Sequence, residues 1–190
     1  MVMLMPSIYT RHGDEGQTGL LYGGRIAKDD LRCEAYGTTD EVISLLGLVR
    51  AATEDHDVRD FSLEIQQQLF VVGSELATAP EGYSIFLKHF IPVEPIMTEQ
   101  LESRIDAMLL KVELPDAFII PGASEVSAII DVARSTLRRA ERRVVTLDRE
   151  GLLVNKEILR YLNRLADFLF ALARYQDREL PVEQLTPQVR

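Results

Sequence analysis

Apolar residues recur every three or four positions in several long segments, and this period is the strongest constraint on the fold. The clearest case lies near the C-terminus, in Ile158, Leu162, Leu165, Leu169 and Leu172. Such spacing places every apolar side chain on one face of an α-helix. Alternating steps of four and three are typical of helices that pack side by side in a bundle.

The same period predicts four other helices. They are expected over residues 33–53, 61–76, 101–112 and 124–151. Pro80 is expected to close the second of these, and Thr98 to cap the start of the third. Strand signals are weak, with only residues 117–120 expected to be briefly extended, and residues 80–97 are expected to be a connecting loop. The sequence therefore predicts an all-α, up-and-down bundle of about five helices.

Length, charge and cysteine content exclude several classes of protein. With 190 residues, the chain is expected to be one domain, 1–190. Thirty acidic against 21 basic residues argue against nucleic acid as a partner, because phosphate backbones require a broad basic surface. The lone Cys33 excludes an intramolecular disulfide and a thiolate metal cluster. No signal peptide or membrane span is visible, so we expect a reducing, cytoplasmic compartment and no membrane partner.

Arginines cluster on the helix expected over residues 124–151. Five of them fall within ten residues of a chain whose net charge is −9. The helix face beside the buried stripe carries Arg134, Arg138, Glu141 and Arg142. Arg139 and Arg143 are expected to point away from that face. Guanidinium groups suit polyphosphate oxygens, because their planar donors match two acceptors at once. A salt-bridged bundle helix explains this segment equally well.

The N-terminal residues differ from the rest because glycines recur from Gly13 to Gly24. Dense glycine lets backbone N–H groups approach an anion closely, and Arg25 and Lys28 would add donors. No G-x-x-x-x-G-K-S/T motif occurs, so this is not a Walker A loop. Taken alone, a loop of this composition is more often a set of turns than a phosphate site.

The remaining polar candidates each have a structural explanation. Asp40 and Glu41 lie near the start of the first helix, where acids favour the positive end of its dipole. Asn163 and Asp167 lie one turn apart and would form a polar pair at the bundle edge. Phe118 would ordinarily be counted as core. The three histidines are scattered, which argues against a di-iron site in the bundle.

Together these segments resemble the ATP:cob(I)alamin adenosyltransferases of the propanediol-utilisation type. The resemblance rests on six motifs: Tyr9-Thr10-Arg11-x-Gly13-Asp14-x-Gly16, Gly24-Arg25-Ile26-x-Lys28-Asp29, Glu34-Ala35-Tyr36-Gly37-Thr38-x-Asp40-Glu41, Phe118-x-x-Pro121-Gly122, Ala133-Arg134-x-x-x-Arg138-Arg139-Ala140-Glu141-Arg142 and Tyr161-Leu162-Asn163-Arg164-Leu165-x-Asp167. They cover most of the chain in the family's order and at compatible spacing. Six such motifs in sequence are far more specific than any one of them.

The resemblance implies a homotrimer of helical bundles with ATP held between subunits. On the N-terminal loop it places ATP-binding residues at Thr10, Arg11, His12, Gly13, Thr18, Gly19 and Lys28. On the helices it places them at Arg138, Arg139, Ala140, Glu141, Arg142 and Asn163. It implies an interface pair of Asp40 and Arg134, and places Phe118 against the corrin ring. Residues 1–32 would be the nucleotide-binding loop region, 33–178 the bundle and 179–190 a tail.

The implied reaction transfers the 5′-deoxyadenosyl group of ATP to cob(I)alamin, forming adenosylcobalamin and releasing triphosphate. Cob(I)alamin is already a powerful nucleophile, so the enzyme needs no base and must stabilise the leaving triphosphate. The resemblance makes Arg138, Lys28 and Phe118 the catalytic residues, with Mg²⁺ on the triphosphate and its ligands in the chain unidentified. A flavoprotein reductase and an adenosylcobalamin-dependent enzyme are expected partners.

Four positions depart from the family pattern. His12 stands where Thr is usual, and Gly19 where a hydroxyl residue is common. Ala123 stands where a second Gly often follows Pro-Gly, and Asp131 replaces a usual His. Loss of a side-chain hydrogen bond at the first two positions would weaken ATP binding.

Two other classes of function remain open from the sequence. The chain could be a nucleotide-binding regulator or a chaperone that delivers adenosylcobalamin with little turnover. It could also be a structural bundle whose arginines only make interface salt bridges. The presence of Lys28, Arg138 and Asn163 together favours the enzyme, since a structural bundle needs no such combination.

Overall fold

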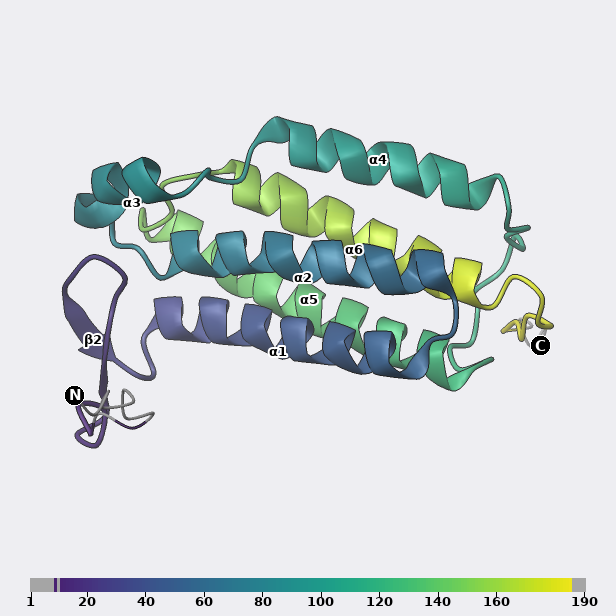
Figure 1. The fold of residues 1–190 in the computed structure, drawn as a ribbon, viewed down its shortest axis with the longest axis horizontal. Coiled ribbons are helices and arrows are strands. Elements are labelled where there is room, and N and C mark those ends of the chain that lie inside the picture. Colours follow the sequence, from purple (N-terminus) through teal and green to yellow (C-terminus); the bar gives the residue numbers. More distant parts are fainter. Residues whose placement is uncertain (1–8, 10, 186–190) are drawn as a thin grey trace, which may run out of the picture.

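Four long helices form the body of the molecule because each carries one apolar face. The computed structural model describes residues 9 and 11–185 of the chain (Figure 1). The four helices are α1 (Leu31–Ala52), α2 (His56–Leu76), α5 (Glu125–Arg149) and α6 (Glu157–Gln176). Helix α1 packs against α2 and α5, and α5 packs against α6. A further helix, α4 (Pro95–Leu109), lies along α6, and the predicted helical bundle is confirmed.

The predicted core faces are the buried faces. The α5 stripe is buried throughout, at Val126, Ile130, Ala133, Leu137, Ala140 and Val144. The α6 stripe is buried as well, at Ile158, Leu162, Leu165, Leu169 and Leu172. The period of the apolar residues therefore identified which side of each helix faces its neighbours. In the described part of the chain, no helix is long and apolar enough to cross a membrane.

Helix starts follow the local capping chemistry. Ser124 caps α5, and its hydroxyl accepts a hydrogen bond from the backbone N–H of Ser127 at 3.2 Å, which confirms the predicted start. The predicted cap at Thr98 is wrong. Helix α4 begins at Pro95, whose fixed φ suits the first helical position, and Thr98 is buried within the helix.

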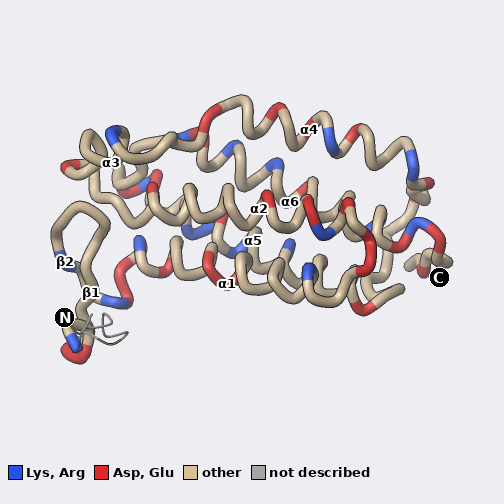
Figure 2. The backbone as a smooth tube through the Cα atoms, viewed as in Figure 1, with Lys and Arg blue, Asp and Glu red and all other residues tan. Residues whose placement is uncertain are grey.

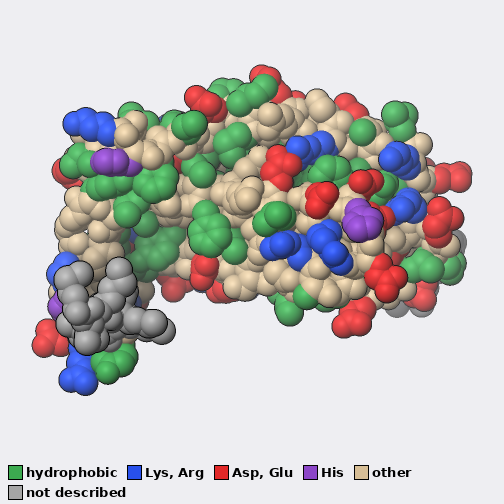
Figure 3. Space-filling view, in the orientation of Figure 1, with side chains coloured by type: hydrophobic (Ala, Val, Ile, Leu, Met, Phe, Trp, Pro, Cys, Tyr) green, Lys and Arg blue, Asp and Glu red, His purple; other side chains and the backbone are tan. Residues whose placement is uncertain are grey.

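The expected loop over residues 80–97 contains structure that the apolar period did not reveal. A 3₁₀ turn (η1, Pro80–Gly82) leads into the short helix α3 (Tyr83–His89), so the described residues form six α-helices rather than about five. Helix α3 spans too few residues to show a period. It is held instead by aromatic packing, since the buried ring of Phe86 stacks on Tyr83 and Phe90. Figure 3 shows hydrophobic side chains gathered at this end of the molecule.

Two short strands form a hairpin before α1, where no strand was expected. Strands β1 (Gln17–Gly19) and β2 (Arg25–Ala27) are antiparallel and too short to show alternation. Tyr22, Gly23 and Gly24 all have positive φ in the connecting turn. Leu21 at the turn donates its N–H to the carbonyl of Ala77 at 2.9 Å, which docks the hairpin on the end of α2. The hairpin otherwise extends beyond the bundle (Figure 1).

Residues 117–120 are briefly extended, as expected, because they pair with the C-terminal tail. Ile119 forms an isolated antiparallel bridge with Gln184. The flanking hydrogen bonds run from Leu185 N to Phe118 O and from Ile120 N to Glu183 O, each at 2.9 Å. The tail thereby returns to the loop between α4 and α5.

Candidate functional site

The arginines of α5 divide into those that pair within the chain and those that do not. Arg139 forms an ion pair with Glu41, and Arg143 pairs with Glu34 at 2.5 Å, so both face α1. The side chains of Arg138 and Arg142 are exposed and donate no hydrogen bond to any described residue. Figure 2 shows the basic positions along α5. Ion pairing with α1 therefore explains Arg139 and Arg143. It does not explain Arg138 and Arg142, whose side chains have no partner among the described residues.

Asn163 and Glu141 join the last two helices beside these free guanidinium groups. The Asn163 Nδ2 donates to the Glu141 Oε1 at 3.0 Å. Asp167 was expected to pair with Asn163, but it accepts from Arg164 at 2.7 Å instead. Ala140, a further expected binding residue, is fully buried in the α5 stripe. The polar side chains near Arg138 thus include the half-buried Glu141 and the exposed Arg142 and Asn163.

A cavity of about 330 Å³ opens between α4, α5 and α6. Its polar lining consists of Arg134, Arg138 and Asp167. Its apolar lining consists of Ile105, Leu109, Leu114, Ala166, Phe170 and Ala171. Two cations against one carboxylate, beside an apolar wall, suit a ligand that is anionic at one end and apolar at the other.

The hairpin holds Lys28 over the glycine turn. The backbone N–H of Lys28 donates to the carbonyl of Gly16 at 2.9 Å, where Gly16 has a positive φ of 77°. A Cβ at Gly13 would lie only 3.0 Å from the Lys28 Nζ. Glycine at this position therefore lets the ammonium group lie against the backbone of the turn. The Lys28 side chain is exposed and donates no hydrogen bond to a described residue.

Arg25 has a structural role in the same hairpin. Its Nη2 donates to the carbonyl oxygen of His12 at 2.5 Å, and its Nε lies 3.3 Å from the Gln17 Oε1. These contacts fasten the residues before β1 to β2, so the Arg25 guanidinium is already engaged. Arg11 has a positive φ of 61°, and its guanidinium lies 5.6 Å from the centre of the Tyr9 ring. Thr10, an expected ATP-binding residue, lies outside the described residues.

The start of α1 is anchored by a buried guanidinium. The Arg32 Nη1 donates to the carbonyls of Leu76 and Thr78, each at 3.1 Å, and Nη2 donates to the Leu152 carbonyl at 2.5 Å. Burial lowers the pKa of Arg32. Tyr36 follows one turn later, where burial and its contact with the Cys33 thiol raise the pKa of Tyr36 to about 12. These contacts fix the helix that follows the hairpin.

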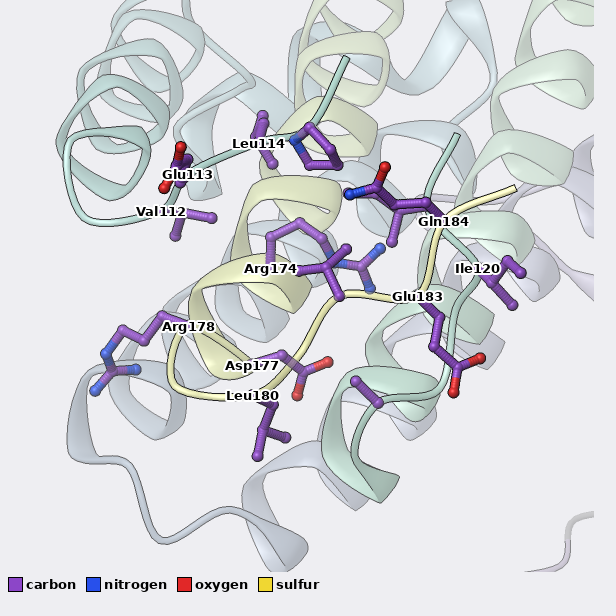
Figure 4. Close-up of a pocket in the computed structure, with 14 residues that line it drawn as sticks. Val112, Glu113, Leu114, Ile120, Arg174, Asp177, Arg178, Leu180, Glu183 and Gln184 are labelled. Carbon is purple, nitrogen blue, oxygen red and sulfur yellow. The ribbon is translucent and has the colours of Figure 1, made fainter. Parts of the chain in front are cut away.

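Phe118 is not a core residue, because 82% of its surface is exposed. Its position is set by the backbone pairing of the 118–120 loop with the tail. Behind this pairing lies a cavity of about 350 Å³, lined in part by Ile119, Ile120 and Gln184 (Figure 4). In Figure 4, Arg174 and Asp177 reach this cavity from the end of α6. The tail and the loop thus present an exposed aromatic ring on a fixed backbone.

The predicted site residues fall into separate groups on one chain. Lys28 lies at the end of the bundle where α1 begins, whereas Phe118 lies at the opposite end, beside the C-terminal tail (Figure 1). Asp40 is exposed on α1 and has no ion pair among the described residues, while Arg134 pairs with Asp131. Asp40 lines a groove of about 380 Å³ with Tyr36 and Phe70. A single chain therefore does not bring Lys28 and Phe118 together.

Comparison with known proteins identifies what the chain is similar to. Residues 8–176 match the family model described as cobalamin adenosyltransferase. The corrinoid adenosyltransferase of Citrobacter freundii is 43% identical over 185 residues, which cover 97% of this chain and 99% of that protein. The corrinoid adenosyltransferase of Bacillus subtilis is 42% identical over 171 residues, covering 88% and 84%. Among solved structures, the chain is similar to a variant PduO-type ATP:corrinoid adenosyltransferase from Lactobacillus reuteri, complexed with cobalamin and ATP. The two sequences are 34% identical, and the TM-score is 0.86. The match covers 95% of this chain and 100% of that one.

Proposed function

The chain belongs to the cobalamin adenosyltransferase family, and from that premise we propose where ATP and the corrinoid bind on it. It is an ATP:corrinoid adenosyltransferase, which transfers the adenosyl group of ATP to a corrinoid. The observation that carries the proposed site is the pair of exposed arginines, Arg138 and Arg142, that have no partner among the described residues. The neighbouring arginines of α5, Arg139 and Arg143, already form ion pairs with glutamates of α1.

The triphosphate of ATP binds to Arg138, Arg142 and Lys28. When cob(I)alamin attacks the 5′-carbon, the C–O bond breaks and its electron pair leaves with the triphosphate. Guanidinium forks stabilise that charge best when they are already in place and need no rearrangement. Glu141 and Asn163 lie beside the two arginines. There the Glu141 carboxylate could accept a hydrogen bond from a polar group of the nucleotide, and the Asn163 amide could donate or accept one. No proton has to be removed from the nucleophile, so no catalytic base is required.

The site is shared between subunits of a homotrimer. The separation of Lys28 from Phe118 on one chain supports this arrangement, because a neighbouring copy would bring the two groups together. The exposed Asp40 and the incompletely bonded Arg134 support it further. In the trimer, Asp40 of one subunit pairs with Arg134 of the next. The described ATP-binding residues of the N-terminal loop, from Arg11 to Gly19, then face α5 of the neighbour.

The corrin ring binds against Phe118. An exposed phenyl ring on a fixed loop is bulky, apolar and unable to coordinate cobalt. It displaces the lower ligand of cob(II)alamin and excludes water from that face, which makes reduction to cob(I)alamin easier. The electron comes from a flavoprotein reductase, and the product passes to an adenosylcobalamin-dependent enzyme.

Mg²⁺ is expected to accompany the triphosphate, since it is commonly bound through substrate phosphates. The described part of the chain has no group of three His, Cys, Asp or Glu side chains that could hold a metal ion. The side chains proposed to face the triphosphate are mainly cations. They do not fit a resident magnesium ion, and stabilisation of the leaving group is assigned to Arg138, Arg142 and Lys28.

Subunit mixing tests the shared site. Lys28→Ala and Arg138→Ala chains are each expected to be nearly inactive as pure proteins. If they are unfolded and refolded together in equal amounts, about a quarter of the interfaces combine an intact Lys28 with an intact Arg138. Activity should rise accordingly above that of either pure variant. Mixed trimers that stay as inactive as the parents would place both residues in a site within one chain.

A further inference from the structure

Asp131 lies on α5 between two arginines and uses a different carboxylate oxygen for each. Its Oδ2 accepts from the Arg174 Nη2 of α6 at 2.5 Å. Its Oδ1 accepts from the Arg134 Nε, one turn further along α5, at 3.3 Å. Asp131 and Arg174 are each only 5% exposed. The carboxylate thus connects a buried cation to one on the surface.

The buried pair fixes where the Asp131 carboxylate lies. An ionised carboxylate is costly to bury unless a hydrogen-bonded cation compensates it, and Arg174 supplies that compensation. The Arg174 guanidinium also lies 5.4 Å from the centre of the Phe170 ring, which limits its movement. The Asp131 side chain, which belongs to α5, is therefore fixed by its ion pair with Arg174 of α6.

The contact leaves the outer end of Arg134 available. Only its Nε is used, and neither Nη donates a hydrogen bond to a described residue. Arg134 lies between two cavities, one of about 330 Å³ that it shares with Arg138 and one of about 390 Å³ that it shares with Pro121 and Arg139. One carboxylate against two guanidinium groups leaves this trio with one uncompensated positive charge.

We infer that Asp131 is a positioning residue for subunit assembly. Anchored by Arg174, it holds Arg134 by its Nε, so that both Nη groups point to an acceptor outside the chain. The inference rests on the proposed interface and makes that acceptor the carboxylate of Asp40 in the neighbouring subunit. An arginine already fixed at its inner edge loses less side-chain freedom when the second acceptor arrives. The single uncompensated charge of the trio matches the single charge of Asp40.

A double-mutant cycle measured in two backgrounds tests this role. The subunit dissociation constant is measured by fluorescence-detected sedimentation for Asp40→Asn, Arg134→Gln and the double variant, first in the natural chain and then in Asp131→Asn. The coupling between Asp40 and Arg134 is expected to be about tenfold in the natural chain and close to absent in Asp131→Asn. The matched control is Glu157→Gln, which removes a pair of the same spacing with Arg160 on α6. It should leave the coupling unchanged.

Each outcome separates the inference from the proposed interface. Absence of coupling in the natural chain contradicts the interface itself. Coupling that persists in Asp131→Asn overturns the role of Asp131 and leaves the interface intact, and equal loss in Glu157→Gln also overturns it. If Asp131→Asn does not fold, Arg134→Lys provides the test, because lysine keeps the charge but lacks separate inward and outward donors. Full coupling between Asp40 and position 134 in the Arg134→Lys chain would then overturn the inference.

Discussion

The backbone N–H of Leu185 donates to the carbonyl oxygen of Phe118 at 2.9 Å, so the C-terminal tail holds the residue proposed to face the corrin ring. The matching bond from Ile120 to Glu183 completes the pairing. Two hydrogen bonds of this kind contribute only about 1 kcal/mol each, yet they hold the backbone that carries the exposed ring.

Replacement of Leu185 by proline removes the donor to Phe118. We expect Leu185→Pro to stay folded and to form less four-coordinate cob(II)alamin with ATP present, measured by electron paramagnetic resonance. Gln184→Pro is the control, because the pairing uses the carbonyl of Glu183 and the N–H of Leu185, and not the N–H of Gln184. An equal signal in both variants would show that the tail does not position Phe118.

The reference for that experiment is Phe118→Ala. Since Phe118 is exposed, its truncation should not cost the 3–5 kcal/mol or so that a core phenylalanine would. The four-coordinate signal should fall, and activity should recover when cob(I)alamin is supplied already reduced. A normal four-coordinate signal would remove Phe118 from the reaction, whatever the tail does.

Arg138→Ala should lose transition-state stabilisation. By analogy with deletion of one oxyanion donor, the loss is about 2–4 kcal/mol, and it should appear in kcat at saturating ATP. Arg160→Ala is a suitable control, since Arg160 is an exposed arginine of α6 paired only with Glu157. A near-normal kcat for Arg138→Ala would show that Arg138 does not stabilise the leaving triphosphate.

Gly13→Ala should raise the KM for ATP through Lys28. The new Cβ would lie 3.0 Å from the Lys28 Nζ and displace the ammonium from the turn. If this is the cause, the same substitution in a Lys28→Ala chain should raise KM no further, because the displaced group is already gone. Additive effects in the double variant would mean that Gly13 acts independently of Lys28.

Glu75 should make stability depend on pH. Burial raises its pKa, although Val93 N, the Asn155 amide and the Tyr83 hydroxyl all donate to it. A raised folded-state pKa means that its stabilising contribution is present below the ordinary value of about 4.3 and is lost as pH rises through the folded value. Glu75→Gln should flatten that part of the curve of unfolding free energy against pH, measured by urea denaturation. An unchanged slope would show that Glu75 does not titrate there.

The sequence predicted the elements whose signal extends over many residues. The stripes of α5 and α6 identified both the helices and their buried faces, because burial of an amphipathic helix imposes a period of three to four. The start of α5 at Ser124 was predicted from the sequence, whereas Thr98 was misread because Pro95 starts α4 earlier. Helix α3 and the β-hairpin are held by aromatic stacking and glycine turns, which leave no such period.

The site was predictable by residue type but not by arrangement. The arginine cluster was evident, and the helical period set Arg139 and Arg143 apart from Arg138 and Arg142. Only the structure shows that Arg139 and Arg143 pair with α1. Asp131 was noticed only as a departure from the family pattern. Its link to Arg174 joins positions 43 residues apart, and no local pattern encodes such a contact. The spatial separation of Lys28 from Phe118 was likewise not visible in the sequence.

The central claim is catalytic adenosyl transfer with triphosphate as the leaving group. Purified protein is incubated anaerobically with chemically reduced cob(I)alamin and ATP in large excess over enzyme, and adenosylcobalamin and triphosphate are quantified over time. We expect equal molar amounts of the two products, far exceeding the amount of enzyme. Adenosylcobalamin formation that stops at one equivalent per site, or that occurs without matching triphosphate, would contradict the account.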